Sequence, residues 1–145
     1  MVRRACAEDL EEILNLYAYL LPDGDYTDIG HFRSKWEEIV RRDNIVYFLA
    51  FKEDQMAATC NITVIPNLTH DRRPFAVIEN VVSRPEVRRK GYARMVVEAA
   101  IDHARIQNCY KIILLSSTHR KSAHEFYKKL GFNSETKTGF HMLLP

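Results

Sequence analysis

The sequence predicts an α+β fold in which a mixed, mostly antiparallel sheet is flanked by helices on both faces. Apolar residues recur with two different periods, close to 3.6 in some segments and close to 2 in others. Predicted strands follow one another in the middle of the chain, and the later part has a strand–helix–strand–helix order. The length of 145 residues fits a single domain, predicted to span residues 1–145.

The first third of the chain predicts one short strand and two amphipathic helices. The strand is expected over Val2–Ala5. The first helix carries apolar residues at steps of three and four: Leu10, Ile13, Leu14 and Tyr17. The second helix has the same spacing: Phe32, Trp36, Ile39 and Val40. The first should end near Pro22, and Thr27 or Asp28 should cap the second, because short polar side chains accept hydrogen bonds from free N–H groups.

The middle of the chain predicts three strands. β-branched and aromatic residues are concentrated in Ile45–Phe51, Met56–Ile65 and Phe75–Val82. The polar turn Lys52–Gln55 should join the first two as an antiparallel hairpin. Between the second and the third, the proline-bounded segment Pro66–Pro74 should form a loop.

The last part of the chain predicts alternating helices and strands. Residues of one helical face mark a long helix: Ala93, Val96, Val97, Ala100, Ile101 and Ala104. The apolar run Tyr110–Leu115 is typical of a strand covered on both faces. A helix containing Phe126 and Tyr127 should then end at Gly131, and Phe132–Leu144 should supply one or two final strands.

Composition excludes several classes of function. With 46% apolar and 28% charged residues the chain resembles an ordinary globular protein, and its net charge of +2 argues against a nucleic-acid partner. The longest strongly apolar run, Ile45–Phe51, is too short to cross a membrane. The three cysteines of the chain form no CxxC pair, and no apolar leader is visible. The six histidines lack the spacing of metal ligands. We therefore expect a cytoplasmic protein without a metal.

The end of the third strand and the helix after it predict an anion site. A basic loop precedes the helix that begins around Gly91, and the free N–H groups at the start of a helix bind anions. Basic residues gather at this point: Arg84, Arg88, Arg89, Lys90 and Arg94. Gly91 and Ala93 are small enough for a diphosphate to approach the backbone. The alternative is a solvated basic loop before an ordinary helix.

Two motifs resemble those of the GNAT N-acetyltransferase superfamily. The segment Arg88–Ala93 reads RRKGYA and matches the R/Q-x-x-G-x-G/A signature. The segment Ala123–Phe132 is similar to the family's A-x-x-x-Y-x-K-x-G-F segment. The opening, with Arg4 and Ala5 before the first helix, also resembles the family's usual start. The resemblance covers nearly the whole chain and implies the GNAT fold, with acetyl-CoA as the acetyl donor.

The resemblance also implies which residues bind acetyl-CoA. In relatives the pantetheine arm pairs with the strand before the signature, here Val81, Val82 and Ser83. The pyrophosphate lies on the N–H groups of the signature loop, here Arg88, Arg89, Lys90, Gly91, Tyr92 and Ala93. Many relatives carry an asparagine at the position of Arg120, and we hypothesise that Arg120 or Lys121 contacts a phosphate of CoA instead.

Glu79 and Tyr127 are the candidate catalytic residues. Glu79 lies in mid-strand among apolar neighbours, where partial burial would raise the pKa of its carboxyl and suit it as a base. A solvent-facing or salt-bridged Glu79 is the alternative. Asn80 should point to the opposite face unless a bulge changes the alternation. In relatives the tyrosine of the matching motif lies near the thioester sulfur, which implies Tyr127 as the general acid.

The predicted acceptor is a primary amine of a small molecule. In this fold acceptor contacts usually come from segments equivalent to Tyr17–Trp36, Pro66–Pro74 and Thr136–His141. Arg72 and Arg73 favour an acidic acceptor, and the sequence locally resembles glucosamine-phosphate N-acetyltransferases, although a solvated loop is the simpler role for both arginines.

Two alternative functions stay open. One is a non-catalytic acyl-CoA-binding regulatory module, and the other is an acetyltransferase of peptide or protein amines. A homodimer is expected because dimers are common in this fold.

Overall fold

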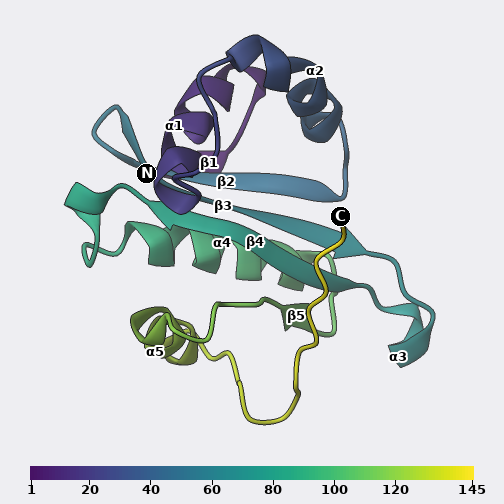
Figure 1. The fold of residues 1–145 in the computed structure, drawn as a ribbon. Helices are drawn as coiled ribbons and strands as arrows, with labels where there is room; N and C mark the ends of the chain where they lie inside the picture. Colours follow the sequence, from purple (N-terminus) through teal and green to yellow (C-terminus); the bar gives the residue numbers. More distant parts are fainter. The chain divides into compact units, whose positions relative to one another are not determined.

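The computed structural model of the chain describes residues 1–145, which fall into two compact units, Met1–Ile113 and Leu114–Pro145. The first unit is built around a five-stranded sheet in the order β1–β2–β3–β4–β5 (Figure 1). The strands are β1 (Val2–Arg4), β2 (Ile45–Lys52), β3 (Gln55–Ile65), β4 (Phe75–Ser83) and β5 (Ile112–Ile113). Neighbouring strands are antiparallel except β4 and β5, which are parallel. The predicted mixed, mostly antiparallel sheet is therefore confirmed.

Helices cover both faces of this sheet, as predicted. The first unit contains α1 (Leu10–Leu20), α2 (Ile29–Val40), the short α3 (Thr69–Arg72), α4 (Tyr92–Ile106) and the 3₁₀ turns η1 (Ala7–Asp9) and η2 (Pro85–Val87). The helices α1 and α2 lie over one face, and α4 runs along the other (Figure 1). The second unit contains a single helix, α5 (Lys121–Lys129).

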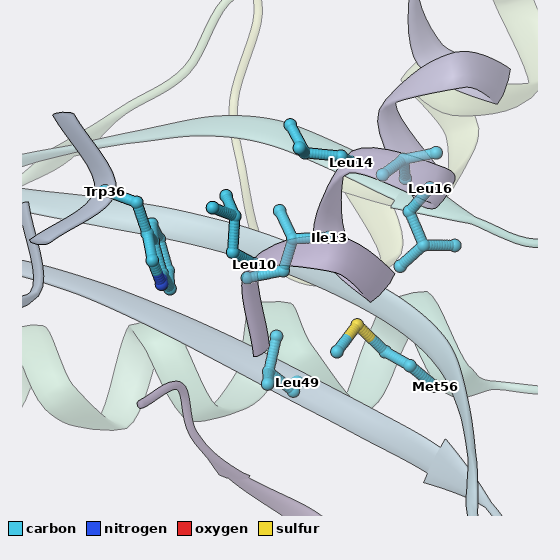
Figure 2. Close-up of a cluster of buried hydrophobic side chains, with 8 residues drawn as sticks. Leu10, Ile13, Leu14, Leu16, Trp36, Leu49 and Met56 are labelled. Atoms are coloured by element: carbon cyan, nitrogen blue, oxygen red, sulfur yellow. The ribbon is translucent and has the colours of Figure 1, made fainter. Parts of the chain in front are cut away.

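Alternate residues of β2 supply the two halves of the core. Leu49 is fully buried and belongs to the same apolar cluster as Ile13 of α1 and Trp36 of α2 (Figure 2). The preceding residue, Phe48, contacts the ring of His103 on α4, with 6.0 Å between the ring centroids. This is the alternation that a strand imposes on its side chains. Burying a leucine or isoleucine side chain stabilises a fold by roughly 1.5–3 kcal/mol. Such burial on both faces of the sheet fixes the helices to it.

Two helix boundaries follow the predicted signals. Asp28 is the N-cap of α2, and its carboxylate accepts a hydrogen bond from the N–H of His31 at 3.2 Å. Gly131 follows the last turn of α5 with φ +96°, a left-handed conformation that glycine adopts without steric cost. Both the predicted N-cap and the predicted helix stop are therefore confirmed.

Two of the strand predictions are wrong. The run Tyr110–Leu115 forms only the two-residue strand β5, and the side chain of Leu115 is 57% exposed. The segment Phe132–Leu144 contains no strand. The strand over Tyr110–Leu115 is short because β5 pairs with β4 at only two positions, which is too few to form a long sheet edge. In addition, residues 133–138 are all polar and supply no apolar face to a strand.

A bulge interrupts β4 at Asn80. The register pairs Thr59 with Val82 and then Asn61 with Glu79, so two residues of β4 oppose one residue of β3. Asn80 takes φ +55°, a left-handed conformation that asparagine tolerates better than most residues. A bulge bends a strand and increases its local twist. The pairing of β4 with β5 ends before this point.

The packing of α4 predicts a loss of stability in mild acid. The guanidinium of Arg4 lies 3.1 Å from His103 Nδ1, and the imidazole is buried with no partner for Nε2. Burial, together with the charge of Arg4, lowers the pKa of His103 below its ordinary value of 6.5. The unfolded chain therefore binds a proton at a higher pH than the folded chain does. The free energy of unfolding should fall as the pH drops below about 6.5.

This prediction is checked by denaturant unfolding of wild type and His103→Gln at pH 7.5 and pH 5.5. Glutamine keeps a polar side chain of similar size but does not titrate. The variant should lose less stability between the two pH values than wild type does. An equal loss in both proteins would show that His103 does not cause the effect.

Candidate functional site

The start of α4 presents unpaired backbone N–H groups to solvent. Gly91 is the N-cap of α4 with φ +91°, and Arg89 in the preceding loop has φ +61°. The first hydrogen bond of the helix runs from the N–H of Met95 to the carbonyl of Gly91 at 3.0 Å. No hydrogen bond occupies the N–H groups of Arg89, Gly91, Tyr92 and Ala93. Four donors at a helix start, where the helix dipole is positive, form an anion-binding surface.

The basic cluster around Gly91 is smaller than the sequence suggested. Arg88 and Arg89 are exposed and make no ion pair. Lys90 is also exposed, but its ammonium donates to the carbonyl of Glu86 at 3.1 Å. Arg94 pairs with Glu98 at 2.8 Å along α4. Arg88, Arg89 and Lys90 therefore keep their positive charge at the loop, whereas the charge of Arg94 is paired with a carboxylate.

Arg84 does not belong to that cluster. Its side chain is only 12% exposed, and its Nε donates to the carbonyl of Met56 at 2.6 Å. The burial and this backbone partner show that the side chain packs against β3. The sequence placed Arg84 with the other basic residues because it lies near them along the chain, whereas its contacts are with the strand.

The second half of β4 has one edge without a strand partner. Pairing with β5 is limited to Ala76 and Val77, whereas β3 lies along the other edge as far as Ser83. The predicted pantetheine contacts, Val81, Val82 and Ser83, all lie in this second half. An unpaired strand edge can hydrogen-bond an extended ligand that carries amide groups.

Glu79 lies on the face of the sheet that α1 and α2 cover. It pairs in register with Asn61, which in turn pairs with Tyr47, and the Tyr47 ring contacts Trp36 of α2 at a centroid distance of 5.0 Å. The Glu79 side chain is exposed. The partial burial expected from its apolar sequence neighbours is therefore absent, because the side chain opens to solvent while its neighbour Ile78 is buried.

The bulge brings Asn80 to the same group of residues. Its Nδ2 donates to Asn61 Oδ1 at 2.9 Å, and Asn61 is only 8% exposed. The regular alternation would have sent Asn80 to the opposite face, and the bulge is the exception that the sequence left open. Asn61 was not among the residues predicted from the sequence. A polar residue within the apolar run of β3 could have indicated it, because a buried amide needs a hydrogen-bond partner.

Aromatic residues of α1 and β2 surround this amide pair. The hydroxyl of Tyr17 is buried without a hydrogen bond of good geometry, and its polar neighbours are Tyr47 and Asn80. Burial raises the pKa of Tyr17 and that of Tyr47, so both phenols stay protonated at neutral pH. Tyr26 contacts the Tyr17 ring edge-on at 6.2 Å. These side chains form a mainly neutral wall on the Glu79 face of the sheet.

The loop between β3 and β4 offers only one of its two predicted cations. Arg73 donates through its guanidinium to the carbonyls of Asn108 and Cys109, both at 3.1 Å. Arg72 is exposed and makes no ion pair. The loop also contains the short α3, in which His70 and Asp71 are left-handed. Arg73 thus fixes the loop, and Arg72 alone stays available to an acidic ligand.

The second unit carries the remaining predicted residues. Arg120 is the N-cap of α5 and is exposed, as is Lys121 beside it. Tyr127 is half-buried in α5, with its ring 5.0 Å from that of Phe126 and 6.0 Å from that of Phe132. Phe126 belongs to α5 and Phe132 follows the turn that ends this helix, so the Tyr127 ring is in contact with both segments.

The structure contains no group of three or more His, Cys, Asp or Glu side chains arranged to hold a metal ion. None of its helices combines the length and the apolar character needed to cross a membrane.

Comparison with known proteins gives a family match and several full-length relatives. The model of the family described as Acetyltransferase (GNAT) family matches residues 7–132. A putative acetyltransferase from Agrobacterium tumefaciens str. C58 has a solved structure with a TM-score of 0.94 and 35% identity over 99% of both chains. A transcriptional regulator from Bacillus halodurans C-125 has a TM-score of 0.90 and 26% identity, again over 99% of both chains. The glucosamine 6-phosphate N-acetyltransferase of Arabidopsis thaliana is 28% identical over 126 residues, which are 85% of this chain and 82% of that protein.

The left-handed conformation of Gly91 leads to a test of the loop. No atom lies within 4 Å of a Cβ added there, so Gly91→Ala meets no steric contact and feels only the backbone strain. That strain should lower the free energy of unfolding by about 1–2 kcal/mol. The control is Gly30→Ala in the first turn of α2, where the backbone is helical and a Cβ would lie 3.3 Å from Asp28 Oδ1, so the loss should be smaller than that of Gly91→Ala. Equal effects of the two substitutions in denaturant unfolding would contradict the assigned conformation.

Proposed function

The chain belongs to the acetyltransferase (GNAT) family, and from this premise we propose that it transfers the acetyl group of acetyl-CoA directly to a primary amine of a small molecule. It is therefore an acetyl-CoA-dependent N-acetyltransferase. The observation that carries the proposal is the set of free N–H groups at Arg89 and Gly91–Ala93 beside the exposed Arg88. Such a surface suits the diphosphate of CoA.

The proposed CoA site extends from this surface along β4. The diphosphate is bound by the loop, chiefly through the free N–H groups of Arg89, Gly91, Tyr92 and Ala93, with the side chains of Arg88 and Lys90 beside them. The pantetheine arm lies along the unpaired edge formed by Val81, Val82 and Ser83. Arg120, at the start of α5, contributes a cation for a CoA phosphate. That residues 1–145 form a single domain stays a prediction.

The proposed reaction uses Glu79 and Tyr127. Glu79 takes a proton from the acceptor ammonium, directly or through a water molecule, and the free amine attacks the thioester carbonyl. A C–N bond forms as the C–S bond breaks, and Tyr127 donates a proton to the departing CoA thiolate. The exposed position of Glu79 supports the water-mediated route. It equally supports a second role, in which the carboxylate binds the ammonium group.

The acceptor that we propose first is a phosphorylated amino sugar. The exposed Arg72 supplies a cation for a phosphate, and the Arabidopsis relative is a glucosamine 6-phosphate N-acetyltransferase. A regulatory module is the second candidate, since the Bacillus halodurans relative is described as a transcriptional regulator. The three free cysteines support a reducing compartment such as the cytoplasm. The homodimer stays a prediction.

A thiol-release screen tests the activity and the acceptor together. Acetyl-CoA is mixed with the protein and with amino sugars, amino sugar phosphates, amino acids, polyamines or peptides, and free CoA is measured. We expect release with an amino sugar phosphate, and a weaker response with the unphosphorylated sugar. Tight binding of acetyl-CoA without release on any acceptor would favour the regulatory module instead.

The roles of the two catalytic candidates are separated by their pH profiles. If Glu79 is the base, Glu79→Gln should lower kcat and change the shape of the pH profile. Tyr127→Phe should lower kcat by about 10²-fold, the usual contribution of a general acid. The exposed Glu86→Gln serves as the control. An unchanged pH profile in Glu79→Gln would reject Glu79 as the base, and a higher KM for the acceptor alone would assign it to binding.

A further inference from the structure

The strand β3 extends past the end of β4, so Met56 pairs with Phe51 of β2 but has no partner on the β4 side. The last pair of the two strands is Ala58 with Ser83, and the N–H of Arg84 still reaches the carbonyl of Ala57 at 2.9 Å. Beyond that point the N–H and the carbonyl of Met56 face a region without a strand. A buried backbone group needs a hydrogen bond, and Met56 is fully buried.

Two side chains supply those hydrogen bonds. The N–H of Met56 donates to Glu12 Oε2 at 3.1 Å, and its carbonyl accepts from Arg84 Nε at 2.6 Å. Arg84 Nη2 lies 3.8 Å from the same Glu12 oxygen. Glu12 comes from α1 and Arg84 follows β4, so the pair joins three elements at one residue. Charged partners make the stronger kind of hydrogen bond.

A series of backbone hydrogen bonds leads from Arg84 to the anion-binding loop. The carbonyl of Arg84 accepts from the N–H of Val87 at 3.2 Å, and the carbonyl of Val87 accepts from Lys90 at 3.3 Å. Val87 is only 3% exposed and fixes the middle of the segment. Gly91 and the free N–H groups follow directly. Their position therefore depends on where Arg84 is held.

We propose that Glu12 and Arg84 are positioning residues for the CoA diphosphate, an inference that rests on the proposed function. Neither side chain needs to touch the ligand. Together they replace the missing strand at Met56 and fix the first residue of the loop that carries the N–H donors. Losing the guanidinium leaves the carbonyl of Met56 without its donor and removes the cation beside the carboxylate of Glu12, so the loop start can move.

The test compares charge-neutralising variants with matched controls. Arg84→Gln and Glu12→Gln remove the pair, whereas Arg105→Gln and Glu11→Gln remove the same charges at exposed positions of α4 and α1. Titration calorimetry gives the Kd for CoA, and steady-state kinetics give kcat and both KM values. Arg84→Gln should weaken CoA binding about tenfold, the loss typical of one charge-assisted hydrogen bond. The acceptor KM and the kcat at saturating acetyl-CoA should stay near wild type, and both controls should bind CoA normally.

Two further measurements separate positioning from a general loss of folding. Amide exchange at Val87 and Lys90 should be faster in Arg84→Gln than in Arg105→Gln, because the N–H of Val87 donates to the carbonyl of the released residue and the N–H of Lys90 donates to the carbonyl of Val87. The double variant should bind CoA about as well as Arg84→Gln alone, because the two side chains act on one residue. If Arg84→Gln does not fold, Glu12→Gln carries the test, since glutamine still accepts from Met56.

Three results would overturn the inference. The first is unchanged CoA binding in both Arg84→Gln and Glu12→Gln. The second is a loss of kcat and of the affinities for CoA and for the acceptor by the same factor. The third is that Arg105→Gln and Glu11→Gln weaken CoA binding as much as the test variants do. Wild-type protein that binds no CoA would contradict the proposed function itself, and that result is recognised before any variant is compared.

Discussion

The unequal pairing of β4 is the constraint on which the rest of the site depends. One edge of this strand is paired with β3 as far as Ser83, whereas the other edge is paired with β5 only at Ala76 and Val77. Backbone polar groups require partners, so a strand whose second half has a free edge needs a ligand or solvent beside it. The bulge at Asn80 marks the change between the two halves. The same strand then leads into the loop whose N–H groups are free.

The free N–H groups of the loop form a preorganised site only because the residues around them are held in place by packing and hydrogen bonds. The sheet that carries β4 is packed by α1 and α2 on one face and by α4 on the other (Figure 1). Val87 is buried, and Arg84 is bonded to β3 through both its backbone and its side chain. A donor group that is already in position loses little conformational entropy when a ligand binds, which is how preorganised sites gain affinity. The exposed Arg88 adds charge to this fixed backbone surface.

Much of the fold could be predicted from the sequence because its signals are local. The period of apolar residues located α1, α2 and α4, and Asp28 and Gly131 marked helix ends through their own backbone chemistry. The strand predicted over Tyr110–Leu115 failed because the extent of a strand is decided by its neighbour, which local sequence does not describe. For the same reason the sequence grouped Arg84 with the loop cations, although the residue packs on β3. The left-handed Asn80 and its bond to Asn61 likewise depend on two strands meeting.

The most direct test of this account is amide hydrogen exchange of the protein with and without CoA. In the proposed complex the diphosphate lies on the N–H groups of Arg89, Gly91, Tyr92 and Ala93, which have no hydrogen-bond partner in the chain. Addition of CoA should slow exchange at these four amides and along Val81–Ser83, with little change at the opposite end of α4 near Arg105. Binding of CoA that protects other amides and leaves these four unchanged would contradict the assigned site.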